Sequence, residues 1–287
     1  MPSQKIGEKP KGLKEPKGLD FKVINQPLEE VYKGIVSKLE RETSESKSFY
    51  FILKSLLTTN HRNYMATRRL VTKEPKLTFQ AFILTRPMID SLFTIVALIS
   101  NPSKYTRQFE LAGYRQFWET YSRQTKRYSE DNDWGNYLEM KRKYLEHTAN
   151  LLGLSSEEKE KPDKNIKYWP IPSRMLREMD LPKDNLELLN EVYQWRYKEL
   201  SSWSHLQWEG IALDVFASLP KQHWFPGKFE SDVVYTGQLF LLMILSEIEG
   251  LKKYGFSKKL KHIWTTLGNY FDETKDYYNL RYKKLLI

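Results

Sequence analysis

Residues 77–100, LTFQAFILTRPMIDSLFTIVALIS, form the most apolar segment of the chain. The spacing and composition of this segment are typical of a helix that is buried against other helices. Its longest apolar run, MIDSLFTIVALIS, is too short to cross a bilayer, which takes about 20 apolar residues. We therefore expect residues 77–100 to run through the centre of a helical core.

Helical spacing of apolar residues continues on both sides of this segment. One helix is expected to begin at Pro27, because acidic residues follow in its first turn and apolar residues recur every three or four positions. The apolar residues of this helix are Leu28, Val31, Ile35 and Leu39. Further helices are expected over residues 46–71, 101–131, 133–153, 173–179, about 185–218, about 231–253 and about 257–285.

The chain shows no convincing strand pattern, hairpin signal or internal repeat. These features predict an all-α fold, a multi-helix bundle of about eight to ten helices in a single domain over residues 21–287. Residues 1–20 are rich in Lys, Pro and Gly and are expected to form a flexible basic tail. Residues 155–173 and 219–231 are expected to be surface loops. A division into two subdomains near residues 155–183 is the alternative.

Composition sets limits on the class of protein. The 287 residues include 18 Tyr and 8 Trp, which argues against disorder. There is no cysteine, so disulfides, thiolate catalysis and zinc–thiolate sites are excluded. The formal net charge of +10 favours contact with polyanions such as RNA, although it also serves solubility alone. No apolar signal segment opens the chain, so we expect a cytoplasmic protein with no membrane partner.

The segment YKELSSWSHLQWEG, residues 197–210, is unusual for a helix because serine and glycine are poor helix formers. Positions four apart share a helix face, so one polar stripe is formed by Tyr197, Ser201, His205 and Glu209, with Ser204 and Trp208 beside it. A histidine flanked by hydroxyls and a carboxylate can act as a general acid or base. The alternative is a partly buried histidine with no chemical role.

A second unusual place is RPMID, residues 86–90, inside the apolar segment. Arg86 and Asp90 lie four residues apart, and buried charges need partners. Pro87 is expected to kink the helix, and a kink beside a buried arginine suits a ligand site. The alternative is an internal salt bridge that only fixes helix packing.

Together, RPMID and YKELSSWSH resemble the motifs of a family of bacterial all-helical proteins. The motifs of that family are Arg-x-x-x-Glu/Asp and, about a hundred residues later, Tyr-x-x-x-Ser-x-x-x-His. The resemblance covers residues 50–215, and Asp90 stands where glutamate is more usual. The family is loosely similar to HEPN domains, which are helical bundles of bacterial antiviral defence and toxin–antitoxin systems. Many HEPN domains are metal-independent ribonucleases that act as homodimers.

This resemblance implies an RNA- or nucleotide-acting protein with His205, Arg86, Asp90, Tyr197 and Ser201 at its site. His205 would transfer protons, and Arg86 would stabilise the charge of the phosphate. No cofactor or metal is expected, because the chain lacks paired histidines and acidic clusters. A homo-oligomer and a partner protein from the same operon are also expected. The second hypothesis is a non-catalytic ligand-binding sensor or scaffold.

The Arg-x4–6-His motif of HEPN nucleases is met at RKYLEH, where Arg142 precedes His147. This spacing also arises by chance, and a solvated helix face is the simpler interpretation of the pair. Basic residues alternate with aromatic residues in the preceding helix, which suits binding of single-stranded RNA, although the aromatics suit a core equally well. The candidate phosphate contacts are Arg107, Arg115 and Arg123, with Ser204 as a further substrate-binding residue. No nucleotide-binding glycine loop and no nucleophile elbow is present.

Overall fold

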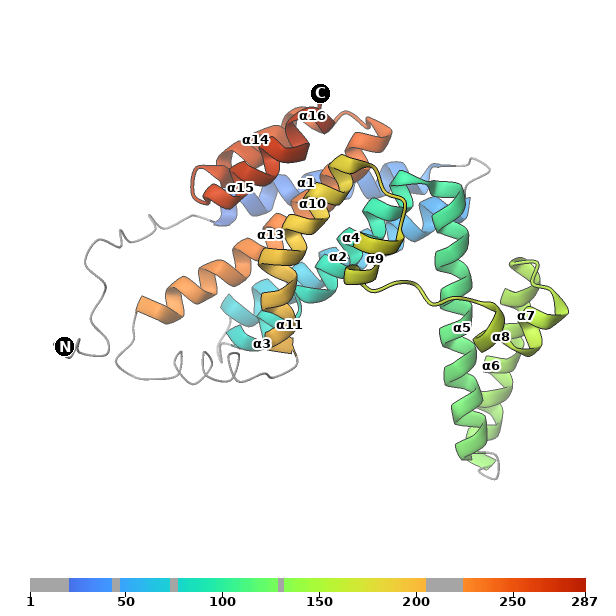
Figure 1. Ribbon diagram of the computed structural model, residues 1–287. Coiled ribbons are helices and arrows are strands. Elements are labelled where there is room, and N and C mark those ends of the chain that lie inside the picture. Colours follow the sequence, from blue (N-terminus) through green and yellow to red (C-terminus); the bar gives the residue numbers. More distant parts are fainter. Residues whose placement is uncertain (1–20, 43–46, 73–76, 129–131, 205–223) are drawn as a thin grey trace. The chain divides into compact units, whose positions relative to one another are not determined.

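The computed structural model of the chain describes residues 21–42, 47–72, 77–128, 132–204 and 224–287 (Figure 1). Every element in these ranges is a helix, and ten of the helices have at least seven residues. The expected all-α fold is therefore confirmed. The helices form two compact units, of which the first combines Met1–Ser100 with Met175–Ile287 and the second is Asn101–Arg174.

The core of the first unit is built around α13 (Trp224–Lys252), which packs against α1 (Phe21–Glu40), α2 (Lys47–Thr72) and α4 (Arg86–Ser100) (Figure 1). Every residue from 233 to 249 is buried, so this part of α13 is enclosed on all sides. Helix α4 is buried almost as fully. The centre of this core is therefore shared between the expected apolar segment and a helix near the carboxyl end.

The expected kinked helix over residues 77–100 is instead two helices, α3 (Thr78–Ile83) and α4. The chain turns at Leu84 and Thr85, and the buried Thr85 hydroxyl donates to the carbonyl of Phe82 at 2.6 Å. Pro87 lies in the first turn of α4, where its missing N–H costs no helical hydrogen bond. A break before Arg86 therefore accommodates Pro87 at a lower free-energy cost than a kink within one continuous helix would.

Helix α1 begins at Phe21, six residues before the expected start at Pro27. Pro27 lies within the helix, where the loss of one backbone hydrogen bond is offset by burial of the apolar stripe. That stripe begins before the proline, and its members are at most 3% exposed: Ile24, Leu28, Val31, Ile35 and Leu39.

Several shorter helices complete the first unit. The expected single helix over residues 257–285 is broken after Gly268, and the expected helix over 231–253 begins earlier, at Trp224. The remaining helices are α9 (Pro172–Glu178), α10 (Lys183–Val192), η1 (Tyr193–Tyr197), α11 (Lys198–Ser204), α14 (Ser257–Gly268), α15 (Asp272–Tyr277), η2 (Tyr278–Tyr282) and α16 (Lys283–Leu285).

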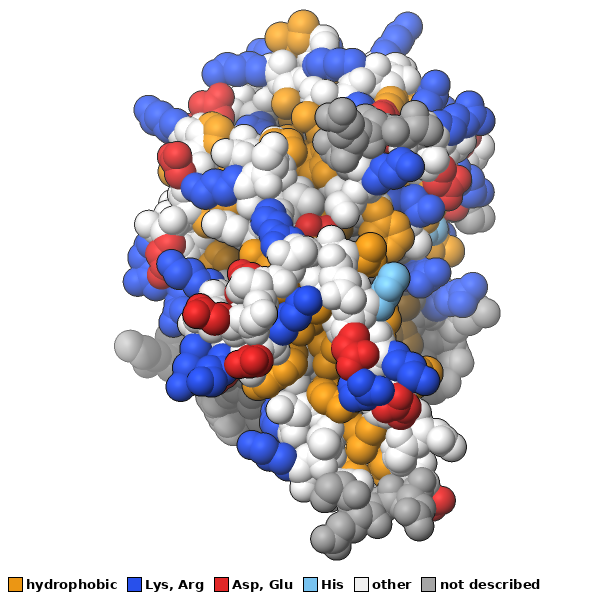
Figure 2. All heavy atoms as spheres, turned by 90° about the vertical axis from the view of Figure 1, so that its right-hand side faces the viewer, with side chains coloured by type: hydrophobic (Ala, Val, Ile, Leu, Met, Phe, Trp, Pro, Cys, Tyr) orange, Lys and Arg blue, Asp and Glu red, His pale blue; other side chains and the backbone are white. Residues whose placement is uncertain are grey.

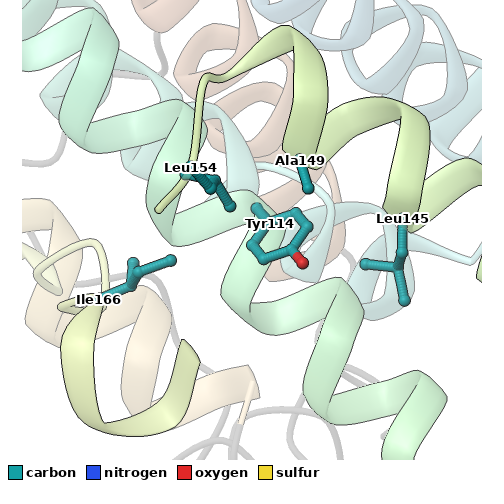
Figure 3. Packing of buried hydrophobic residues seen from close by; sticks show 5 residues of the cluster. All are labelled: Tyr114, Leu145, Ala149, Leu154 and Ile166. Atoms are coloured by element: carbon teal, nitrogen blue, oxygen red, sulfur yellow. The ribbon is translucent and has the colours of Figure 1, made fainter. Parts of the chain in front are cut away.

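The second unit is a helical hairpin of α5 (Pro102–Tyr128) and α6 (Asn132–Leu151), followed by the short helices α7 (Ser156–Glu160) and α8 (Pro162–Asn165). These short helices occupy the stretch that was expected to be a loop. The second unit has a small hydrophobic core of its own. Figure 3 shows the side chains of this core pointing toward one another. The core residues are Tyr114, Leu145, Ala149, Leu154 and Ile166.

Two segments, Thr78–Ser100 and Glu230–Lys252, reach the length and hydropathy of a membrane-crossing helix, contrary to the expectation that the apolar runs are too short. Within their most apolar windows, 61% and 94% of the residues are buried inside the protein. This burial is consistent with core helices of a soluble protein.

Candidate functional site

The first residue of α4, Arg86, joins that helix to the segment that carries Tyr197 and Ser201. Its guanidinium donates to the Ser201 hydroxyl from Nη1 at 3.1 Å and to the Tyr197 hydroxyl from Nη2 at 3.0 Å. The same guanidinium lies 5.0 Å from the centroid of the Tyr197 ring, within the range of a cation–π contact. The structure thus brings together three of the five residues that the sequence placed in one site.

Asp90 lies one turn after Arg86 in α4 and is half-buried. Burial raises the pKa of the Asp90 carboxyl, and the positive charge of Arg86 offsets only part of this effect. The pKa of Tyr197 is raised as well, first by burial and then by the Asp90 carboxylate. Asp90 therefore belongs to the electrostatic surroundings of the site, in a place that disfavours its ionised form.

Tyr197 ends a π-helical segment, η1, which the sequence analysis missed. The Lys198 amide donates to the Tyr193 carbonyl five residues earlier, so this turn holds one more residue than an α-helical turn. The rings of Tyr193 and Tyr197 stack with centroids 5.2 Å apart. Single π turns are frequent at functional sites because they re-aim side chains within a helix. In the sequence, the four-residue spacing of Tyr193 and Tyr197 is the only feature that points to this stacked pair of rings.

His205, the expected proton-transfer residue, lies outside the residues that the structure describes. Ser204 is the last residue of α11, and its side chain is also outside them. The approach of His205 to Arg86 therefore stays a prediction.

Arg196 precedes Tyr197 but belongs to a different cluster, which was also missed. Its guanidinium binds the Glu273 carboxylate through two hydrogen bonds of 3.0 and 2.7 Å and reaches the Asp232 carboxylate at 3.5 Å. Glu199 lies at 3.4 Å. Burial acts to lower the pKa of Arg196, but the surrounding carboxylates raise it above the usual value. The Arg196 guanidinium is thus held by ion pairs with the carboxylates of Glu273, Asp232 and Glu199.

An open pocket of about 610 Å³ adjoins this cluster. Burial and neighbouring carboxylates raise the pKa of Glu199 at its edge, with Arg196 opposing. The lining is mostly acidic and aromatic, in a chain whose net charge is positive. Its residues are Glu191, Trp195, Arg196, Glu199, Glu273, Asp276, Tyr277 and Leu280.

A histidine–glutamate pair lies elsewhere in the first unit. The Nε2 atom of His61 is 2.6 Å from a carboxylate oxygen of Glu29, and the imidazole stacks on Tyr32 with centroids 3.8 Å apart. Burial acts to raise the pKa of Glu29, but the His61 hydrogen bond and nearby Lys33 lower it overall. His61 stands in the basic run HRNYMATRR, but its partner Glu29 lies 32 residues away, so no local motif in the sequence indicates the pair.

The secondary candidates Arg142 and His147 are both exposed on α6. Arg142 forms hydrogen bonds to Glu139 at 2.7 and 2.8 Å and also binds Glu146. Two carboxylates therefore compete with any phosphate for this guanidinium. This arrangement is the solvated helix face that was the simpler interpretation.

The three candidate phosphate contacts of α5 differ in their surroundings. Arg115 donates to Glu119 at 2.9 Å and to the Ile166 carbonyl at 2.5 Å, and it lies 3.6 Å from the Tyr168 ring centroid. It fastens α5 to the chain that follows α8. Arg123 is exposed and Arg107 is half-buried, and a phosphate contact for these two stays a prediction.

Within the described part of the chain, no three His, Asp or Glu side chains are grouped so that they could hold a metal ion. Comparison of the chain with protein-family models, curated proteins and solved structures finds no match.

Proposed function

We propose that the chain is a HEPN-like helical protein that acts on RNA or a nucleotide, with Arg86 as its phosphate-binding group. One observation carries this proposal: two neutral hydroxyls, those of Tyr197 and Ser201, accept hydrogen bonds from the Arg86 guanidinium. These two acceptors hold the guanidinium in a fixed orientation. The oriented fork then suits the geometry of a phosphate.

The reaction that fits best is metal-independent RNA cleavage. His205 would exchange protons with the 2′-hydroxyl or the leaving group, and Arg86 would stabilise the negative charge of the pentavalent phosphate. Proton transfer and charge stabilisation would then suffice without a metal.

This mechanism is tested by cleavage of a mixed RNA pool in excess EDTA. We expect the wild type to cleave, and His205→Ala and Arg86→Ala to lose activity while staying folded by circular dichroism. Arg41→Ala is the matched control, because it removes the same charge from an exposed position after α1. Loss of wild-type cleavage in EDTA would refute the metal-free reaction. Activity that survives both substitutions would move the site, with Arg142 and His147 next to be tested.

A second candidate function is a non-catalytic ligand-binding sensor or scaffold. The observation that favours it is again the Arg86 contacts, because they also clamp α4 to η1 and α11. In this case Arg86→Ala would lower the melting temperature, and the folded wild type would bind a nucleotide without cleaving RNA. Equilibrium dialysis with nucleotides, run beside the cleavage assay, separates the two functions.

The proposal places the protein in the cytoplasm, as a homodimer in a bacterial defence or toxin system. Its net charge of +10 supports contact with a nucleic acid backbone. RNA affinity should then fall steeply between 50 and 200 mM salt, by about tenfold or more if several phosphates are contacted.

A further inference from the structure

Helix α6 has two apolar faces, and only one of them is covered within its unit. The covered face carries Leu138, Leu145 and Ala149, which are at most 9% exposed, and Figure 3 shows Leu145 and Ala149 beside Tyr114 of α5. Beside it runs a second line of side chains, which faces solvent. Its members are Tyr137, Met140, Tyr144, His147 and Leu151, and the four hydrophobic ones are 40%, 60%, 57% and 73% exposed.

The spacing along this second line is three, four, three and four residues. This is the spacing of the a and d positions of a coiled coil, which forms a seam on one side of a helix. Single exposed hydrophobic residues are normal on a protein surface, but four on one seam of one helix are typical of an interaction surface. The seam extends over about 21 Å at 1.5 Å per residue, which is long enough for four turns of a partner helix.

Charge at the edges of the seam selects the partner. The nearest ionised side chains on its two edges are Lys141 and Lys143, and the other edge residues, Asn136, Thr148 and Asn150, are neutral. Lys143 is 70% exposed, and its carboxylate neighbour, Glu139 at 3.6 Å, lies on the side away from the seam. Lys141 donates to Gln124 at 2.6 Å, an uncharged partner. Both edges of the seam are therefore basic.

A second copy of α6 is a poor match for this surface. In either orientation of two paired helices, the edge residues of one helix meet those of the other. An antiparallel pair of α6 helices would place lysine against lysine, which is unfavourable, and a parallel pair would place Lys141 and Lys143 against the neutral Asn136 and Thr148, so a second copy supplies no ion pair in either orientation. A helix with acidic edges would instead form ion pairs across both sides of the seam. Figure 2 shows hydrophobic surface between charged side chains in its lower half, where the α5–α6 hairpin lies.

We propose that the solvent-facing line from Tyr137 to Leu151 on α6 is a docking surface for an amphipathic helix of a partner protein, with an apolar three–four seam and glutamate or aspartate at its edges. This surface lies on a different helix, in a different unit, from Arg86, Tyr197 and Ser201. It gives the protein a place to receive a regulatory or inhibitory helix.

Two synthetic peptides of three heptads test this proposal with the full-length protein. Both carry leucine at a and d. One carries glutamate and the other lysine at e and g, and each repels its own copies, so both stay largely monomeric. We expect the acidic peptide to bind, measured by fluorescence anisotropy, and the basic peptide to bind at least about tenfold more weakly.

Substitutions then locate the binding surface. We expect Met140→Asp and Tyr144→Asp to weaken binding of the acidic peptide by about tenfold or more, because each places a charge in the seam. The matched control is Ile171→Asp, which makes the same change at a site that is 59% exposed and outside α6. Circular dichroism of each variant confirms that it is folded.

The other outcomes overturn the proposal. Equal binding of both peptides, binding of neither, or equal weakening by the Ile171→Asp control would each show that α6 is not an acid-selective docking surface. Sedimentation of the wild type and Met140→Asp tests the second copy as occupant. A wild-type dimer that Met140→Asp dissociates would assign the seam to self-association.

Discussion

Arg86 and Arg196 show how the neighbours of an arginine decide what it can do. Both side chains are only partly accessible, and both lie within the first unit. Arg196 is bound by the carboxylates of Glu273 and Asp232, so a phosphate would have to displace two anions. The contacts of Arg86 with Tyr197 and Ser201 are to neutral hydroxyls. The two carboxylates therefore disfavour a phosphate contact at Arg196, and the phosphate contact is proposed for Arg86.

The raised pKa of Asp90 leads to a prediction about pH. A carboxyl whose pKa is higher in the folded state favours folding when protonated, and this contribution is lost as pH rises from the usual Asp pKa of about 3.9 through the folded value. Asp90→Asn mimics the protonated form. We expect it to raise the free energy of unfolding at pH 7 and to leave it unchanged near pH 3. Urea unfolding at both pH values measures the difference, and an equal effect at both would contradict it.

At the scale of the helix, the turn between α13 and α14 depends on one buried carboxylate. Glu249 is 0% exposed, and its oxygens accept from the backbone amides of four consecutive residues, 254–257, at 2.9 to 3.1 Å. Gly255 lies in this turn with a φ of +99°, which glycine alone adopts without strain. The carboxylate thus caps α14 from within the preceding helix.

Glu249→Gln is expected to destabilise the protein strongly. The amide group would point a donor at amides that themselves need an acceptor, and the cost of such buried unsatisfied groups is at least about 3 kcal/mol in total. Glu187→Gln removes the same charge from an exposed position of α10 and should change stability by less than about 0.5 kcal/mol. Urea unfolding of the two variants provides the comparison, and similar losses would show that the turn does not depend on Glu249.

The extra residue of η1 leads to a prediction about deletions. Trp195 is 70% exposed within this π turn, so its deletion should restore α-helical hydrogen bonding while keeping the helices on both sides in register. We expect the deletion to lower the melting temperature by less than about 5 °C, the effect of roughly 1 kcal/mol. Deletion of Leu188, which is buried in α10, would rotate a helix face by about 100° and unfold the unit. Thermal denaturation of both variants checks this, and equal loss would contradict the special role of the π turn.

The limits of sequence-based prediction follow from how local each signal is. Helices α2, α5 and α6 could be predicted because periodicity and the Asn101 cap, whose side chain accepts from the Lys104 amide at 3.2 Å, are written in adjacent residues. The break before Arg86 and the π turn could not, because they depend on tertiary packing. The meeting of Arg86 with Tyr197 and Ser201 could be inferred, since each polar residue interrupts an apolar or aromatic helix. The Arg196 cluster could not, because Glu273 lies 77 residues away on a helix with no unusual composition.

For the molecule as a whole, the sequence predicted one domain over residues 21–287, with a division into two subdomains near residues 155–183 as the alternative. Within the all-α fold, the contacts group the helices into two compact units. The core of the second unit, residues 101–174, contains fewer buried apolar side chains than the core of the first unit. A small core gives a lower local free energy of opening, because less apolar surface is buried per residue. We therefore expect amide hydrogens of residues 101–174 to exchange faster than those of α13.

Two cavity-forming substitutions test whether the units open independently. Leu145→Ala, in the core of the second unit, and Leu242→Ala, in α13, each remove a side chain that is at most 5% exposed, at an expected cost of about 2–5 kcal/mol. If the units are separate, hydrogen exchange measured by mass spectrometry should speed up only in peptides of 101–174 for the first variant. For the second variant it should speed up only outside that range. The same acceleration of exchange along the whole chain in both variants would instead show a single cooperative domain, because a cavity in either core would then lower the free energy of one shared unfolding event.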